Sequence, residues 1–241
     1  MRQIVLSHRR RSMVWVERVD TETSCAWLTD EPVVERLTLD EHSWVDVVRA
    51  FVPRADEVHH ELETTVPWEA GKVFRYERWI EEPRLSSWQR GARRHPALED
   101  AEAWISTRYK VRFDGVALAL YRHERDSVAF HRDREMKWLD DTVIGVLTLG
   151  ARRPWVMKPI TSGRRNDDDL AGAFDLSPAS GDLLVMGGRC QVDWLHAVPK
   201  VQGRVRSRIS AQWRWTSRRG RPDTAPSYYA PRHFTSGPRG G

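Results

Sequence analysis

The residues best suited to chemistry lie in the segment Ser127-Val128-Ala129-Phe130-His131-Arg132-Asp133, which we expect to be a strand ending in a His-x-Asp pair. Side chains two positions apart on a strand point to the same face, so His131 and Asp133 can direct a nitrogen and an oxygen at one point. A second histidine on a neighbouring strand would complete the two-histidine, one-carboxylate set that binds non-haem Fe(II) and leaves positions open for substrate and oxygen. The candidate for this third ligand is His196.

The His-x-Asp pair also has an ordinary explanation. A chain of this composition contains about one such pair by chance, and an aspartate at the end of a surface strand commonly forms a salt bridge. The metal interpretation therefore depends on its surroundings. The stretch between His131 and His196 is long enough to hold the intervening strands of a jelly roll, which would bring the two histidines together.

A site of this kind also needs a cation for a carboxylate co-substrate. Polar side chains recur at every second position of an expected strand over residues 206–214, and they are Arg206, Arg208, Ser210, Gln212 and Arg214. Such alternation usually marks the solvated face of an edge strand. Because this strand follows a potential metal ligand within the same β-rich region, we favour an inward polar pocket, where an arginine fork could pair with a carboxylate.

The elements that must position these residues fall into two groups. Before residue 113 we expect a helix over about 38–52, with apolar residues at helical spacing and Pro53 at its end, and a second over about 96–108, with Pro96 near its start. Residues 73–80 are typical of a strand and residues 81–84 of a turn. After residue 113, short β-rich runs alternate with turn signals: 116–121, 128–133, 142–150, 154–160, 182–187, 196–201 and 206–215.

These elements indicate an α+β fold whose C-terminal body is a β-sandwich or jelly roll. We divide the chain into an N-terminal segment (1–36), a helical or lid region packed on the core (37–112), a jelly-roll catalytic core (113–216) and a basic tail (217–241). The tail is rich in arginine, glycine, proline and serine and has nothing to bury, so we expect it to be disordered.

Composition limits the class of protein. The chain of 241 residues is basic, with 39 lysines and arginines against 34 aspartates and glutamates, but much of the excess lies at the two ends, so the charge permits a polyanionic partner without demanding one.

Two cysteines suggest a reducing compartment, and no apolar run is long enough for a signal peptide or membrane helix, so we expect a cytoplasmic protein. Most of the twelve tryptophans should be core, and one or two in a cleft could stack on a planar ligand. The chain has no long-period repeat, Gly-rich phosphate loop or nucleophile elbow.

Over roughly residues 80–215 the sequence resembles the AlkB family of 2-oxoglutarate- and Fe(II)-dependent dioxygenases. The matching segments occur in the family's order and spacing: 113–122, 126–133, 143–151, 180–188 and 194–200. The resemblance implies a double-stranded β-helix, or jelly roll, with N-terminal helices and a substrate lid. It also implies Fe(II) and 2-oxoglutarate as cofactors.

The resemblance assigns roles to individual residues. His131, Asp133 and His196 would bind iron. The family's Arg-x-Asn-x-Thr-x-Arg motif falls on the strand at 208–214, so Arg208 would pair with the distal carboxylate of 2-oxoglutarate, assisted by Tyr121. At the other end of the motif, Arg214 would lie near the end of the co-substrate that chelates iron, and Ser210 would line the same pocket.

Three positions depart from the family pattern. The motif's Asn and Thr are Ser210 and Gln212, and the Asn that usually precedes the co-substrate Tyr by two positions is Ala119. These departures concern the finer co-substrate contacts. They are compatible with a divergent subgroup that has an unusual substrate, or with weakened catalysis.

Two residues are candidates for substrate binding. Glu135 matches an acidic position that contacts the exocyclic group of the base in relatives, although a loop carboxylate paired with Arg132 or Arg134 is equally reasonable. Trp88 lies near the position where the lid supplies an aromatic ring that sandwiches the base against the iron histidine. A tryptophan buried under the sheet is the alternative.

The implied activity is oxidative dealkylation of alkylated nucleobases in DNA or RNA, a form of alkylation damage repair, by a monomer that uses O2 and acts on a single-stranded or flipped-out base. Three alternatives stay open at this stage. The same iron chemistry could act on a protein, lipid or small molecule. The chain could also be a nucleic-acid-binding jelly roll whose catalysis has lapsed, or a structural cupin-like module with histidines in its core.

Overall fold

The computed structural model of the chain describes residues 3–4, 14–18, 27–75, 77–91, 94–133, 136–160 and 170–218. Its helices are α1 (Ala55–Thr65), α2 (Pro96–Tyr109) and the single turn α3 (Cys190–Asp193). Its strands are β1 (Gln3–Ile4), β2 (Val14–Arg18), β3 (Val33–Thr38), β4 (Ser43–Val48), β5 (Glu69–Arg75), β6 (Arg78–Gln89), β7 (Val116–Tyr121), β8 (Val128–His131), β9 (Thr142–Gly150), β10 (Val156–Pro159), β11 (Phe174–Asp175), β12 (Leu183–Gly188), β13 (Trp194–Val198) and β14 (Arg208–Thr216).

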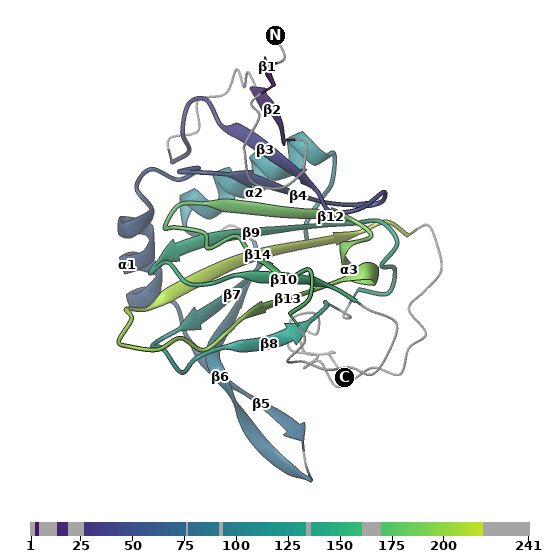
Figure 1. Cartoon of the computed structure of the whole chain (residues 1–241). Helices are drawn as coiled ribbons and strands as arrows, with labels where there is room; N and C mark the ends of the chain where they lie inside the picture. Colours follow the sequence, from purple (N-terminus) through teal and green to yellow (C-terminus); the bar gives the residue numbers. More distant parts are fainter. Residues whose placement is uncertain are drawn as a thin grey trace.

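Within the described residues the strands form two antiparallel sheets (Figure 1). The larger sheet has ten strands in the order β1-β2-β3-β4-β12-β9-β14-β7-β6-β5, and the smaller has four in the order β11-β10-β13-β8. Both orders differ from chain order, because the chain crosses between the sheets as it would in a jelly roll. The β5–β6 hairpin projects from the body of the molecule (Figure 1).

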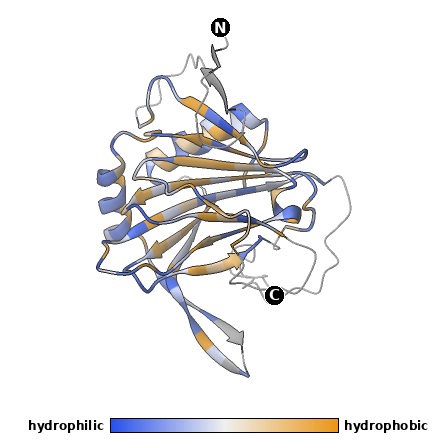
Figure 2. Ribbon diagram, in the orientation of Figure 1, coloured by the Kyte–Doolittle hydropathy of each residue, from blue (hydrophilic) through white to orange (hydrophobic). Residues whose placement is uncertain are grey.

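The outer face of the larger sheet is covered by α1 and α2. A hydrophobic cluster joins buried residues of both helices to side chains of the central strands: Val58, Leu62, Leu98, Ala101, Ile105, Leu147, Leu149, Ile209 and Trp213. The surface of α1 that faces away from the sheet is hydrophilic (Figure 2). An amphipathic helix of this kind is stabilised mainly by the apolar face that it buries.

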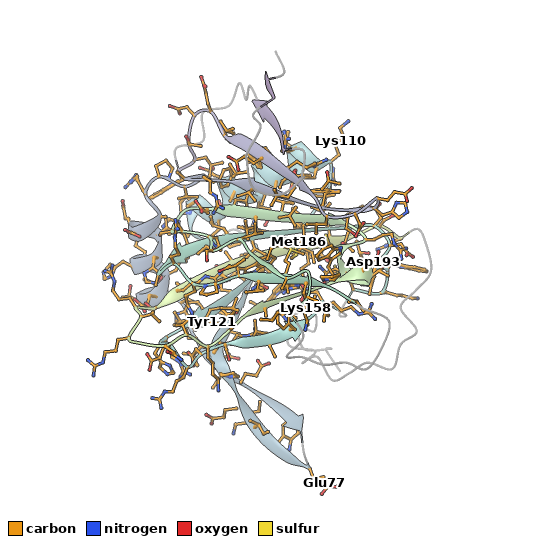
Figure 3. All side chains as sticks on the ribbon, viewed as in Figure 1. Glu77, Lys110, Tyr121, Lys158, Met186 and Asp193 are labelled. Carbon is orange, nitrogen blue, oxygen red and sulfur yellow. The ribbon has the colours of Figure 1, made fainter. Side chains whose placement is uncertain are left out.

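The inner face of the larger sheet packs against the smaller sheet. This second cluster includes Tyr121, Ile144, Val146, Leu184 and Met186 from the larger sheet, and Trp155, Met157 and Trp194 from the smaller one or its edge. Tyr121 and Met186, both labelled in Figure 3, are buried members of this cluster. Since β9 is buried along nearly its whole length, its sequence is mostly apolar, interrupted only by Thr142 and Thr148, and lacks alternation.

Two facing antiparallel sheets with helices on one side constitute an α+β double-stranded β-helix, and the predicted fold class is confirmed. The strands predicted at 116–121 and 142–150 coincide with β7 and β9, and the helix predicted at 96–108 is α2. Along β14, Ile209, Ala211 and Trp213 pack under the helices, so the alternate polar residues face the smaller sheet. Arg206 was expected on that polar face, which was wrong: it is exposed and precedes the first residue of β14.

Residues 38–52 do not form the predicted helix. They contain β4, which pairs with β3 on one side and with β12 on the other. Val45 and Val47 belong to the inner cluster and Val48 to the outer one, so both faces of this strand are buried. Apolar residues on both faces imitate helical spacing, and β-branched valines favour the strand.

The segment 73–84 was also predicted wrongly. One strand followed by a turn was expected, but the structure has a hairpin that turns at Glu77, whose φ is 60°. Pro83 lies inside β6, close to the point where the β5–β6 register shifts between Ala70 and Lys72. A residue without an amide hydrogen is tolerated in a strand at such an irregularity.

Some expectations concern parts of the chain that the structure does not describe. The basic segments 9–11 and 219–241 lie outside the described residues. The four-part division of the chain stays a prediction, and the β3–β4 hairpin spans its boundary at residue 36. Among the described helices, none is long and apolar enough to cross a membrane.

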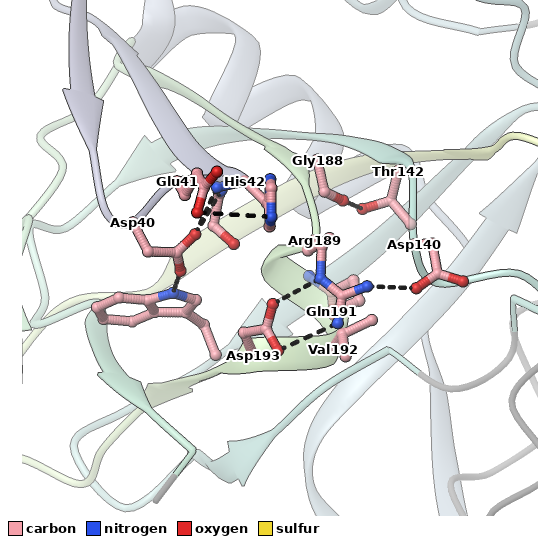
Figure 4. A network of polar contacts seen from close by, with 12 residues as sticks. Asp40, Glu41, His42, Asp140, Thr142, Gly188, Arg189, Gln191, Val192 and Asp193 are labelled. Atoms are coloured by element: carbon pink, nitrogen blue, oxygen red, sulfur yellow. Dashed lines mark hydrogen bonds and ion pairs between the residues drawn. The ribbon is translucent and has the colours of Figure 1, made fainter. Parts of the chain in front are cut away.

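A polar network holds α3 in place beside the entry to β13 (Figure 4). The Arg189 guanidinium contacts the Asp140 carboxylate at 2.6 Å and the Asp193 carboxylate at 2.9 Å. The indole of Trp194 donates to Asp40 at 2.6 Å. Because β13 begins at Trp194, these contacts fix the direction in which the strand carrying His196 enters the smaller sheet.

Candidate metal centre

Three potential metal ligands meet on the inner face of the smaller sheet. His131 on β8 and His196 on β13 are direct partners across the two strands, and their ring centroids lie 4.3 Å apart. Asp133 follows β8 by two residues. Each of these residues offers one ligand atom, and the three atoms all lie within 4.8 Å of one another. The sequence prediction that these residues lie together is therefore correct in its geometry.

Neighbouring groups orient both imidazole rings. His131 Nδ1 lies 2.9 Å from the carbonyl oxygen of Ala129. A carbonyl only accepts, so Nδ1 carries the hydrogen in this contact and Nε2, which is 3.6 Å from the Asp133 carboxylate, keeps its lone pair. The ring of Trp155 stacks on His196 with centroids 5.4 Å apart. Both rings are thus held before any ligand binds.

The electrostatics suit metal binding. Burial lowers the pKa of His131, and burial together with the neighbouring His131 lowers the pKa of His196 to about 3. Burial alone would raise the pKa of Asp133, but Arg214 and the two histidines outweigh it and hold that pKa below its usual value. The site therefore presents two neutral imidazoles and one carboxylate at neutral pH, which are the protonation states that a metal ion requires.

Two residues support Asp133, and the sequence identified only one of them. Arg214 Nε donates to the Asp133 carboxylate at 2.8 Å, and the Asp133 amide donates to Gln191 Oε1 at 2.7 Å. Gln191 is fully buried in α3, close in the chain to His196. Arg132 adds contacts from its Nη1 to the Gln191 and Val192 carbonyls, both at 3.3 Å. The position of Gln191 between β12 and β13 gave no chemical signal in the sequence.

A buried cation lies on the same side of β14, six residues before Arg214. Arg208 is fully buried and pairs in register with Tyr121 of β7. Its Nη2 donates to Thr148 Oγ1 at 3.1 Å, whereas its Nε and Nη1 have no hydrogen-bond partner among the described residues. Burial, reinforced by Arg153, lowers the pKa of Arg208 to about 10. Buried polar groups are nearly always paired, so these donors fit the carboxylate of a bound ligand.

Two further arginines surround Tyr121, and sequence reasoning missed both. Arg153 is buried and donates to the carbonyls of Asp126 and Pro199, each at 2.8 Å, which joins the loops that follow β7 and β13. On β6, Arg84 is close enough that its charge lowers the pKa of both His131 and His196. Tyr121 in turn raises the pKa of Arg84 against the effect of burial. The site is therefore more cationic than its motifs suggested.

The two motif positions that depart from the family pattern are both on the inner face of β14. Ser210 is buried and faces Ala119 on one neighbouring strand and Thr148 on the other. Gln212 Oε1 accepts a hydrogen bond from Arg214 Nη2. Arg214 also contacts Asp133, a potential metal ligand. Gln212 therefore helps to position Arg214 against Asp133.

The two predicted substrate residues differ in what can be said of them. Trp88 pairs with Ala117, which pairs with Gln212, so Trp88 shares the inner face of the larger sheet near its Arg214 end. It is half-buried and, among the described residues, packs into neither hydrophobic cluster. The Arg90 guanidinium lies 5.5 Å from the centroid of its ring. Glu135 lies outside the described residues.

Comparison with known proteins is consistent with this geometry. The chain matches the sequence model of the 2OG-Fe(II) oxygenase superfamily over residues 7–221. It is 28% identical over 177 residues to human alpha-ketoglutarate-dependent dioxygenase alkB homolog 3, covering 68% of this chain and 62% of that protein. It is 30% identical over 125 residues to the DNA oxidative demethylase ALKBH2 of Arabidopsis thaliana, covering 44% of this chain and 40% of that protein. The chain thus spans about three fifths or less of the length of these two relatives.

A solved structure shows the same fold. The prolyl hydroxylase of Trichoplax adhaerens, in complex with a hypoxia inducible factor peptide, superposes with a TM-score of 0.52 at 13% sequence identity. The match covers 71% of this chain and 83% of that one. At this level of identity the likeness concerns the fold alone.

Proposed function

Because this chain belongs to the 2OG-Fe(II) oxygenase superfamily, we propose that it removes alkyl groups oxidatively from alkylated nucleobases in DNA or RNA. The observation that carries the proposal is the combination of two features on one inner face. One is the ligand set of His131, Asp133 and His196, and the other is the buried Arg208, two of whose donors have no partner among the residues that the structure describes. Support for nucleic acid as the substrate comes from the relatives, one of which is named a DNA oxidative demethylase.

The residues of the site fit both cofactors of the superfamily. His131, Asp133 and His196 would hold Fe(II), and Arg208 would hold the distal carboxylate of 2-oxoglutarate. With both bound, 2-oxoglutarate and O2 yield succinate and CO2 while one oxygen atom enters a substrate C–H bond, so that an N-methyl group leaves as formaldehyde and the base recovers its N–H.

The protein's own contribution is to orient charges and exclude water. Thr148 fixes the direction of the Arg208 fork through the contact at 3.1 Å, and Tyr121 lies beside it, with the guanidinium 5.4 Å from its ring centroid. At the metal end, the positive charge of Arg214 balances the negative charge of the Asp133 carboxylate and lowers its pKa, so the carboxylate stays ionised. The apolar cluster between the sheets surrounds these charges and strengthens their interactions, because it keeps the local dielectric low.

On the substrate side, Trp88 would stack on the base and Glu135 would accept a hydrogen bond from its exocyclic amino group. A base inside a duplex cannot reach a buried metal centre, so the substrate would be single-stranded or flipped out. The same proposal includes a monomeric enzyme of alkylation damage repair in the cytoplasm. The small number of cysteines is consistent with that reducing compartment.

The experiment measures succinate and formaldehyde after incubation with Fe(II), 2-oxoglutarate and oligonucleotides. Methylated single-stranded DNA, methylated duplex DNA, methylated RNA and an unmethylated strand are compared. We expect both products only with a methylated substrate, and neither with the His131→Ala or Arg208→Ala variant. If the rate of succinate release is the same with and without every oligonucleotide, the substrate belongs to another chemical class.

A further inference from the structure

Trp138 is an aromatic side chain that the metal centre and the hydrophobic cores leave unused. It is half-buried and, in the part of the chain that the structure describes, belongs to neither hydrophobic cluster. Trp104 and Trp213, in contrast, lie deep in the outer cluster, and Trp155 lies in the inner one. A large ring that contributes to no core is available to stack on a ligand.

The backbone places Trp138 at the metal end of β14. The hydroxyl of Thr216 donates to the Trp138 carbonyl, and the Ser217 amide donates to the Asp141 carbonyl at 2.9 Å. Thr216 lies two residues beyond Arg214 on the same face of the strand, and Arg214 contacts Asp133. The backbone of Trp138 is therefore anchored at the end of β14 that carries Arg214, on a segment that leads into β9.

A cation accompanies the Trp138 ring. The ammonium group of Lys137, an exposed residue, lies 5.2 Å from the ring centroid. A positive charge beside a flat ring suits a ligand that combines a base with a phosphate. Aromatic platforms flanked by cations are the usual means by which proteins bind single-stranded nucleic acid.

Trp88 provides a second ring of the same kind. On the inner face of β14, Gln212 shares a row across the strands with Trp88, and the Thr216 hydroxyl donates to the backbone carbonyl of Trp138. One tryptophan residue is therefore fixed on each side of Arg214 along the strand. At about 3.3 Å per residue, Gln212 and Thr216 are roughly 13 Å apart along the strand. That separation leaves room for one base near the metal centre and for a neighbouring base beyond it.

We propose that Trp138 stacks on the nucleobase adjacent to the one that undergoes reaction, while Lys137 contacts the phosphate between them. This inference rests on the proposed function and deepens it. It makes the substrate an unpaired stretch of a strand, because a free nucleoside has no neighbouring base to occupy Trp138. A fully stacked duplex does not offer a free face to this ring.

The test compares Trp138→Ala with Trp138→Phe, which keeps an aromatic ring. Stacking of one base is worth about a 5- to 150-fold change in affinity, so Trp138→Ala should raise KM for a methylated single-stranded oligonucleotide within that range. Trp138→Phe should stay within about threefold of the wild type. Neither variant should change turnover of a methylated mononucleoside, which lacks the second base. A Thr216→Val variant, which releases the Trp138 carbonyl and leaves the ring intact, should give an intermediate KM.

Binding distinguishes the failure of this inference from the failure of the proposed function. Fluorescence anisotropy with an unmethylated single-stranded oligonucleotide detects the Trp138 contact without any catalysis, and thermal unfolding shows whether each variant is folded. A wild-type protein that binds the strand through Trp138 but demethylates nothing would refute the proposed function alone. A folded Trp138→Ala variant with unchanged oligonucleotide Kd and KM, or with an equal loss on the mononucleoside, would overturn the inference.

Discussion

Replacing Arg208 by methionine tests two separate effects of this buried cation, its destabilisation of the ligand-free fold and its contribution to the affinity for 2-oxoglutarate. Burial lowers the pKa of this guanidinium from its ordinary value to about 10. At about 1.4 kcal/mol per pKa unit, the ligand-free protein disfavours the charged form by roughly 3 kcal/mol. Since methionine fills much of the same volume without charge, we expect Arg208→Met to raise the free energy of unfolding of the ligand-free protein by about 1–3 kcal/mol at pH 7.

The same substitution should abolish most of the affinity for 2-oxoglutarate. Removing one partner of a buried, hydrogen-bonded charge pair costs about 2–5 kcal/mol in binding, which corresponds to a rise in Kd of roughly 30-fold to several thousand-fold. A Thr148→Val variant is the matched control. It removes only the acceptor that Arg208 Nη2 contacts at 3.1 Å, so its effect on 2-oxoglutarate binding should be smaller.

Two measurements check these opposite effects. Urea unfolding without ligand gives the change in stability, and titration calorimetry under anaerobic conditions, with Mn(II) in place of Fe(II), gives the Kd for 2-oxoglutarate. A variant that is less stable without ligand, yet binds 2-oxoglutarate within about threefold of the wild type, would refute the reasoning. In that case Arg208 would be a structural residue.

Three further substitutions or conditions test other parts of the structure. Gln191→Leu removes the acceptor of the buried Asp133 amide, so we expect a loss of about 1–3 kcal/mol in stability and a rise of about 10- to 100-fold in the Kd for Mn(II), whereas an unchanged Kd would rule out a positioning role. The pKa of His196 is about 3 in the folded chain and 6.5 ordinarily, so the metal-free protein should lose about 2 kcal/mol of stability in urea unfolding as the pH falls from about 6.5 to about 5, and His196→Gln should lose less over the same interval. Gly187→Ala forces a Cβ atom into the indole of Trp44 and should cost about 1–3 kcal/mol by thermal unfolding. If a Trp44→Leu substitution in the same chain does not recover part of that loss, the clash is not its cause.

The metal ligands could be found from the sequence because their positions follow simple rules. His131 and Asp133 are two residues apart at a strand end, and the strand pairing then places His196 directly across from His131. The polar face of β14 could also be predicted from the sequence, because its polar residues alternate with Ile209, Ala211 and Trp213. These three apolar residues pack under the helices. The His131–Asp133 spacing and the alternation along β14 are local patterns, which a sequence records, whereas His196 was identified through the segment 194–200 that resembles the AlkB family.

Other features depend on contacts between distant segments, and the sequence did not reveal them. Gln191 acts on Asp133 from 58 residues away in the chain, and nothing local distinguishes it from a surface glutamine. Arg153 similarly resembles any loop arginine until Asp126 and Pro199 present their carbonyls to it. The strand β4 was mistaken for a helix because α2 and the smaller sheet cover its two faces, and these contacts cannot be inferred from the local sequence.

The central claim is that the two-histidine, one-carboxylate centre couples oxidation of 2-oxoglutarate to dealkylation of a base. The most direct measurement is the stoichiometry of the two events on one methylated single-stranded oligonucleotide, with succinate quantified by chromatography and the loss of CH2 followed by mass spectrometry. We predict one succinate for each methyl group removed, and neither product in an Asp133→Ala variant. Succinate formation on an oligonucleotide whose mass does not change would contradict the claim.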